Sequence, residues 1–195
     1  MSLLPKLNYM TGANLMNKNR PKGFTIIEML VSTAVFVMVV SISMSTFVFA
    51  LRAQRQSLAT QDLLDQTSYA VEYMSRALRM AKKDLTGVCI PAKTNYQLIS
   101  DASGFVQQIK FLSYQNQCQS FIWENNQLKE DKDGVVNSLT SENVAISWFD
   151  AELAGETQVD NIQPRITFSW CALGKENSSI VIKTAVSQRD ADIRE

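Results

Sequence analysis

The strongest hydrophobic pattern in the chain is an apolar run over residues 29–51. These 23 residues contain no Asp, Glu, Lys or Arg, and twelve of them are Leu, Ile, Val or Phe. As a helix rising about 1.5 Å per residue, the run is about 34 Å long, which is enough to cross a hydrocarbon core of about 30 Å. The twelve large apolar residues favour insertion by about −4 to −7 kcal/mol, which six Ser and Thr residues weaken without reversing. The pattern predicts a membrane-spanning helix.

Helical spacing continues beyond this run. Residues 52–83 contain no Pro or Gly, and small or apolar positions recur three and four residues apart at Leu63, Thr67, Ala70, Met74, Ala77 and Ala81. Such a stripe is suited to packing on a sheet. A single helix over residues 24–83 would be about 90 Å long, which favours a protruding stalk. We expect Thr86-Gly87, with Pro91 close behind, to end it.

Beyond residue 86, apolar and polar residues alternate with the period of β-strands. The alternating sets are Ile109 and Phe111; Val144, Ile146 and Trp148; Ile166, Phe168 and Trp170; and Ile180, Ile182, Thr184 and Val186. Asn125-Asn126 predicts a hairpin between residues 118–123 and the segment from Gln127, and residues 130–134 predict a turn. We therefore expect an α+β fold, in which the helix packs on a mostly antiparallel sheet of five or six strands.

Charge is balanced overall, with 19 basic and 19 acidic residues, but it is uneven along the chain. Residues 1–23 hold four of the basic residues and no acid, which leaves a net charge of −4 beyond them. Basic residues directly before an apolar run keep that end of the chain in the cytoplasm, so everything after the run should be exported. A secretory signal cleaved after Ala50 would need a shorter apolar stretch. A plain single-span anchor remains open.

Several kinds of chemistry find no support. Histidine is absent, which removes Ser-His-Asp and Cys-His nucleophiles and the commonest metal ligand. Asp131-Lys132-Asp133-Gly134 is similar to the start of a calcium loop, but no Glu follows at loop spacing, so we interpret it as a hairpin turn. There is no Gly-rich phosphate loop and no basic patch with interleaved aromatic residues. We predict no catalytic residues, no metal, no cofactor and no direct nucleic-acid binding.

The junction before the apolar run carries the most specific signal. Residues 22–31 read Lys-Gly-Phe-Thr-Ile-Ile-Glu-Met-Leu-Val. A charge at the centre of a membrane span costs about 2.5–3.5 kcal/mol, and less near an end, so Glu28 is a functional residue by default. A short basic leader ending in Gly and followed by Phe-Thr-Ile-Ile-Glu resembles the processing signal of type IV prepilins and type II secretion pseudopilins.

This resemblance implies a role for each junction residue. A membrane prepilin peptidase would cut after Gly23 and N-methylate the new first residue, Phe24. Glu28 would meet the Phe24 amine of a neighbouring subunit and set the axial register, since two buried charges are tolerable together. The alternative is a Glu28 that only reaches toward the membrane interface. The implied partners are prepilin peptidase/N-methyltransferase, other pilin or pseudopilin subunits, an inner-membrane assembly platform and membrane lipid.

The resemblance also predicts a domain organisation. We expect a cleaved leader over residues 1–23, a transmembrane stalk over 24–51, its amphipathic continuation over 52–85 and an exported β-domain over 86–195. Met16 begins an eight-residue leader of the usual kind, so residues 1–15 are interpreted as a mis-assigned start or an extension. The expected function is a structural minor pilin or J-type pseudopilin of the inner membrane. The alternative is a single-span protein that presents an exported β-domain for ligand binding or adhesion.

Three cysteines lie in the part expected to be exported. They permit one disulfide and one free thiol. In its predicted strand, Cys171 shares a face with Thr167 and Ser169, opposite the apolar face, so Cys89–Cys118 is the favoured pair. Three unpaired, buried cysteines are the alternative.

Overall fold

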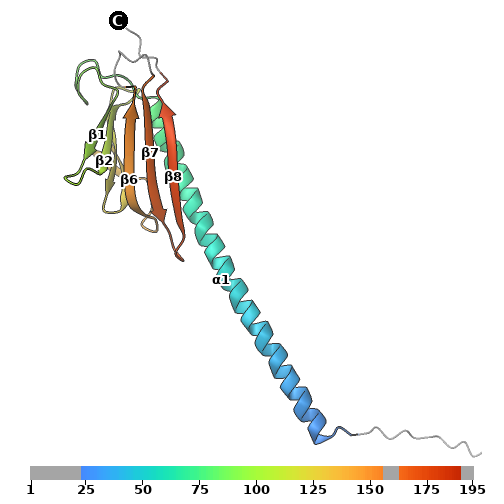
Figure 1. Cartoon of the computed structure of the whole chain (residues 1–195). Coiled ribbons are helices and arrows are strands. Elements are labelled where there is room, and N and C mark those ends of the chain that lie inside the picture. The colour runs from blue at the N-terminus through green and yellow to red at the C-terminus, as the bar shows by residue number, and fades with distance from the viewer. Residues whose placement is uncertain (1–22, 156–162, 190–195) are drawn as a thin grey trace, which may run out of the picture. The chain divides into compact units, whose positions relative to one another are not determined.

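A computed structural model describes residues 23–155 and 163–189. Within them, one helix is followed by strands in two antiparallel sheets (Figure 1). The helix is α1 (Ile26–Arg79). The five-stranded sheet holds β1 (Tyr96–Ser100), β2 (Val106–Leu112), β3 (Cys118–Glu124), β4 (Gln127–Lys132) and β5 (Val135–Ser138) in that order. The three-stranded sheet holds β6 (Ala145–Ala154), β7 (Arg165–Leu173) and β8 (Ser179–Ser187).

The predicted α+β class is therefore confirmed, with a pilin-like order of elements. The expectation of a single sheet of five or six strands was wrong, because eight strands form within the described ranges and divide between two sheets. The chain also divides into two compact units, with the boundary between Phe47 and Val48 inside α1. The first unit contains the apolar run up to Phe47, and the second contains the last four residues of the run, the rest of α1 and both sheets.

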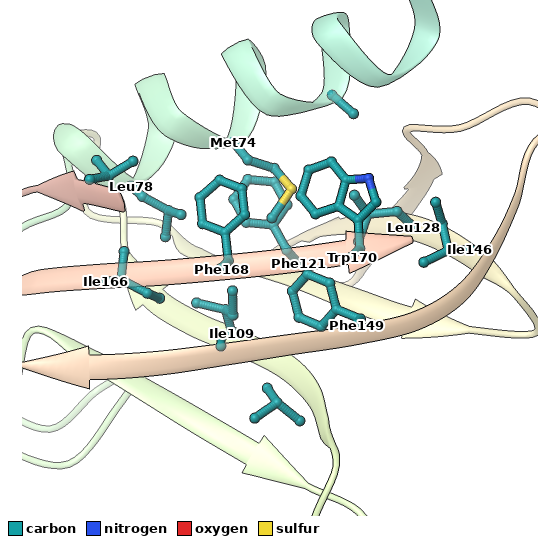
Figure 2. Packing of buried hydrophobic residues seen from close by; sticks show 14 of the residues in the cluster. Met74, Leu78, Ile109, Phe121, Leu128, Ile146, Phe149, Ile166, Phe168 and Trp170 are labelled. Carbon is teal, nitrogen blue, oxygen red and sulfur yellow. The ribbon is translucent and has the colours of Figure 1, made fainter. Parts of the chain in front are cut away.

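The core of the second unit lies between α1 and the inner faces of both sheets. The helix buries Leu63, Thr67, Ala70, Met74 and Leu78, spaced three to four residues apart. Figure 2 shows Met74 over the aromatic rings of Phe121, Phe168 and Trp170. The predicted stripe is confirmed at its first four positions and at Ala81, which is buried just beyond the helix end, whereas Ala77 is half-buried and Leu78 is buried next to it. Met74 is fully buried, so its contacts hold the helix on the core.

The helix ends at Arg79, earlier than the Thr86-Gly87 stop expected from the sequence. Its last carbonyl groups accept hydrogen bonds from distant parts of the fold. Tyr96 Oη donates to the Leu78 carbonyl at 2.8 Å, and Arg189 N donates to the Arg79 carbonyl at 2.8 Å. These donors satisfy the groups that a helix end leaves unpaired. The helix can therefore stop without a glycine.

A β-bulge in β6 corrects the predicted alternation. Ile146 pairs with Ala172 and Trp148 pairs with Cys171, so Ser147 is an extra residue in β6. One extra residue reverses which side chains face the core. Ile146 and Phe149 are consequently buried, while 37% of Trp148 is exposed on the outer face. The expectation that Trp148 shares the inner face with Val144 and Ile146 was wrong.

The hairpin turns follow ordinary two-residue geometry. Asn125 and Asn126 both have positive φ angles, 53° and 59°, which is typical of a type I′ turn and confirms the predicted hairpin. The next turn is shorter than predicted. Residues 130–132 belong to β4, and only Asp133 (φ 49°) and Gly134 (φ 88°) form the turn. Asp131 Oδ1 accepts a hydrogen bond from Gly134 N at 2.8 Å, so this carboxylate serves the turn itself.

Candidate functional site

The start of α1 carries the predicted processing residues. Gly23 and Phe24 precede the helix, and 78% of Phe24 is exposed. Thr25 caps the helix, because its Oγ1 accepts a hydrogen bond from Glu28 N at 3.2 Å and its carbonyl accepts one from Met29 N at 3.2 Å. The helix therefore starts at Ile26, two residues later than expected. The scissile bond proposed from the sequence lies in exposed, non-helical chain.

Glu28 occupies the third position of the helix and is exposed. Thr25 and Glu28 have the spacing of a capping box, in which an acid follows the cap by three residues. No residue in the described ranges forms an ion pair with this carboxylate. A carboxylate near a helix N-terminus gains about 0.3–1 kcal/mol from the helix dipole. This gain is smaller than the cost of a charge within a membrane, about 2.5–3.5 kcal/mol at the centre.

The helix that follows exposes its apolar side chains. All of residues 26–51 are exposed, including Phe36, Ile42, Phe47 and Phe49. By length and composition, α1 can cross a membrane. A soluble domain would bury these side chains, since large exposed apolar surfaces mark interaction with lipid or with other proteins. The apolar helix therefore indicates membrane anchoring.

The hydroxyl groups within this helix have internal partners. Each of the following donates to a backbone carbonyl three or four residues earlier: Ser32, Thr33, Ser41, Ser43, Ser45 and Thr46. Such bonds satisfy hydroxyl donors without water or a second helix. They lower the cost that the six residues would otherwise add in lipid. The polar residues of the run are thus compatible with a span.

The second unit contains a buried carboxylate that the sequence reasoning missed. Asp84 is fully buried, and its carboxylate accepts hydrogen bonds from the backbone N–H groups of Cys89, Ile90, Gly87 and Thr86 at 2.7–3.1 Å. The bond from Cys89 is the largest influence on its pKa. Together the four bonds hold the pKa of Asp84 well below its usual range, although burial alone would raise it. The Asp-x-Thr-Gly pattern, typical of an Asx turn, was the available signal.

The same loop is tied to the five-stranded sheet by a disulfide. Cys89 and Cys118 are bonded, with their Cα atoms 5.4 Å apart, which is the pair favoured by the sequence. Cys171 is a free, half-buried thiol on β7. The disulfide and Asp84 together order the segment that leads from α1 into β1.

One further cluster of polar groups lies where α1 meets β4. A pocket of about 260 Å³ is bordered by Tyr73, Arg76, Gln119 and Lys132. Tyr73 Oη donates to the buried carboxylate of Glu130 at 2.7 Å, and Lys132 Nζ lies 3.1 Å from that carboxylate. The hydrogen bond with Tyr73 and the nearby Glu130 raise the pKa of Lys132, although its burial opposes this. Lys132 neutralises the Glu130 carboxylate, and the hydrogen bond from Tyr73 attaches α1 to β4.

No set of three His, Cys, Asp or Glu residues in the described part of the chain is arranged to hold a metal ion. The geometry therefore directs attention back to the start of α1. There, the small residue Gly23 and the exposed Phe24 precede an exposed apolar helix, and Glu28 lies in the first turn of that helix.

Residues 18–44 match a family model described as the prokaryotic N-terminal methylation motif. This motif is the prepilin-type signal of type IV pilins and pseudopilins, and the match includes Gly23, Phe24 and Glu28. The signal and the order of elements are similar to those of type IV pilin-like and pseudopilin subunits, and they support that class for this chain. The family that carries this signal is structural rather than enzymatic. Comparisons with curated proteins and with solved structures gave no match.

Proposed function

We propose that this chain is a minor structural subunit of a type IV pilus or a type II secretion pseudopilus. It is processed by prepilin peptidase between Gly23 and Phe24, methylated at the Phe24 amine, and then assembled into a helical filament or used to prime one. The methylation motif over residues 18–44, located directly at the start of an exposed apolar helix, carries the proposal. Prepilin peptidase, other subunits and the membrane assembly platform are the partners.

The local geometry supports cleavage after Gly23. A Cβ atom added to Gly23 would meet no atom within 4 Å, and Phe24 is exposed. The requirement for glycine therefore does not come from packing within this chain. It comes from the peptidase, which must accommodate the residue before the cut.

The energetic cost of placing the Glu28 charge in a membrane supports a role in assembly. The helix dipole stabilises its charge by about 0.3–1 kcal/mol, whereas a charge costs about 2.5–3.5 kcal/mol at the centre of a span and less near an end. A cationic amine at Phe24 of a neighbouring subunit would supply the missing partner. Because that pair can form at one stagger only, it would set the register between subunits.

The proposed topology follows from charge. Lys18, Arg20 and Lys22 precede the span, which keeps the leader in the cytoplasm and exports the unit that begins after it. Residues 1–23 form the leader, 24–51 the membrane stalk, 52–85 its continuation into the loop after α1, and 86–195 the β-domain. Residues 1–22 of this leader lie outside the described residues.

Mass spectrometry of the mature N-terminus tests the function. A chain that begins with N-methylated Phe24 is the expected result in cells that contain prepilin peptidase. An intact chain, or one cut after Ala50, would overturn the proposal. Either result would favour a single-span protein that presents an exported β-domain.

A further inference from the structure

The outer face of the three-stranded sheet carries an apolar row created by the β6 bulge. The inner face of β7 is buried in the core through Ile166, Phe168 and Trp170. On the opposite face, Trp148 of β6 pairs with Cys171 of β7, which in turn pairs with Val181 of β8. Trp148 is 37% exposed and Val181 64% exposed. No described helix or strand lies over this face in Figure 1.

The next row of paired residues on the same face carries an acidic residue at one end and a basic residue at the other. Asp150 of β6 pairs with Ser169 of β7, and Ser169 pairs with Lys183 of β8. Asp150 and Lys183 are both exposed, and they are separated by the whole width of β7. The acid of this row is therefore on β6 and the base on β8.

We propose that this face binds a second copy of the same chain through a two-fold axis parallel to β7. That axis superposes β6 of one copy on β8 of the other and preserves position along the strands. Trp148 then lies over Val181 of the second copy, and Asp150 lies over its Lys183. Each contact occurs twice, and the charges become complementary because the row is reversed.

The two-fold axis also determines which residues meet at the centre of the interface. Cys171 and Ser169, both on β7, each face their own counterpart. At the strand end Arg165 also faces itself, and Glu152 in the neighbouring row lowers that repulsion by its opposite charge. The face carries two acids and two bases per copy among these rows, so the stacked pair has no excess charge of either sign.

The size of the face predicts a weak association. Strands of nine residues at about 3.3 Å per residue, spaced about 4.8 Å apart, give a face of roughly 30 by 14 Å. The flat area of roughly 400 Å² per copy is about half that of a standard specific interface and is typical of weak, transient association. Anchoring both copies in one membrane raises their effective concentration. The dimer should therefore form in membranes and dissociate on dilution in detergent.

Cys171 makes the proposal directly testable. It is the free cysteine of a chain with three cysteines, since Cys89 and Cys118 are bonded to each other. Sheets stack face to face about 10 Å apart, whereas a disulfide requires Cα atoms within about 6.8 Å. A direct Cys171–Cys171 disulfide is thus not expected. A bismaleimide with a short spacer should join the two thiols.

The experiment treats membranes that contain the full chain with this bismaleimide and measures the cross-linked dimer on non-reducing gels. The single variants Asp150→Lys and Lys183→Asp place like charges opposite each other twice, so each should lower the cross-linked fraction about tenfold. The double variant Asp150→Lys/Lys183→Asp should restore it. Glu142→Lys, which lies in the loop before β6, is the matched charge control and should leave it unchanged.

Three outcomes would overturn the proposal. The first is quantitative labelling of Cys171 by a monofunctional maleimide with no dimer from the bifunctional reagent. The second is a product whose mass shows a different protein as the partner. The third is a dimer that persists in both single variants. Because none of these readouts depends on cleavage at Gly23, failure here would be distinguishable from failure of the proposed function.

Discussion

Tyr96 of β1 closes the end of α1 by donating its hydroxyl hydrogen bond to the carbonyl oxygen of Leu78 at 2.8 Å. Both residues are buried, and burial raises the pKa of the Tyr96 hydroxyl. A carbonyl in the last turn of a helix has no partner within the helix. The sheet therefore supplies a donor to the helix end, and this buried hydrogen bond joins α1 to β1 within the second unit.

Replacement of Gly23 by Leu should block maturation. Because an added side chain meets no neighbouring atom, the chain should insert and fold normally, and only the peptidase should be affected. Immunoblots should show the unprocessed chain of 21.9 kDa. Gly23→Ala is the control, and it should retain most processing because the residue stays small. Mature protein at the normal level from Gly23→Leu cells would contradict the cleavage assignment.

Two replacements of Glu28 distinguish the effect of its charge from its effect on the helix cap. Glu28→Gln retains a side chain that a capping box accepts, and Glu28→Val removes both functions. If charge pairing sets the register, both variants should insert in the membrane and fail to enter filaments. The measurement is the amount of subunit in sheared filaments relative to membranes. Normal incorporation of Glu28→Gln as the sole copy would show that the charge is not required.

The second unit should depend on the second half of α1 for its stability. A protein that begins near residue 53 should be soluble and folded, whereas one that begins at Gly87 should aggregate because the inner faces of both sheets lose their cover. Met74→Asp in the longer protein should lower the free energy of unfolding by about 4 kcal/mol or more, since it buries an unpaired charge.

Leu58→Asp provides the matched control for this prediction. Leu58 lies on the same helix but is 58% exposed, so its replacement should change stability by less than about 0.5 kcal/mol. Thermal unfolding followed by circular dichroism compares the two variants. A cooperative transition in the Gly87 protein, equal to that of the longer one, would exclude the helix from the core.

Asp84 should make the stability of the second unit sensitive to acid. Its pKa is lower in the folded chain than in the unfolded chain, so its contribution to stability is complete above about pH 4 and declines as pH falls below that value. Asp84→Asn should lower the free energy of unfolding at neutral pH by about 2–3 kcal/mol and flatten this acid dependence. Denaturant titrations at several pH values give both quantities.

Asp101→Asn is the control for Asp84, because Asp101 caps a similar turn through Ser103 N and Phe105 N but is not fully buried. Its effect should be below about 1 kcal/mol. Equal losses in the two variants would show that burial does not distinguish these carboxylates.

Reduction of the Cys89–Cys118 disulfide should destabilise the second unit. The bond closes a loop with a sequence separation of 29, for which the chain-entropy relation predicts about 3.6 kcal/mol. The free energy of unfolding should fall by that order on adding reductant or in Cys89→Ser. Cys171→Ser should not respond to reductant differently from the natural chain, since its thiol is free. Identical unfolding curves with and without reductant would refute this role.

The sequence could predict the features that depend on neighbouring residues. The length of the apolar run, the Gly23-Phe24 junction with Glu28, and the spacing from Leu63 to Met74 are all local patterns. A helix and a span follow from such patterns because backbone periodicity and transfer free energy act along the chain. The Asn125-Asn126 turn belongs to the same class, since its residues themselves favour the left-handed conformation.

Tertiary contacts decided the rest. Arg79 ends α1 because Tyr96 and Arg189 satisfy its last carbonyl groups, and these donors come from other parts of the chain. Trp148 faces outward because Ser147 is an extra residue with no register partner in β7, and this is visible only when the two strands are aligned. Alternation within one strand cannot reveal a bulge, since the bulge is defined by the partner's register. The helix, the span and the hairpin turn depend on residues that are close in the sequence. The end of α1 and the face of Trp148 depend on hydrogen-bond partners from other parts of the chain.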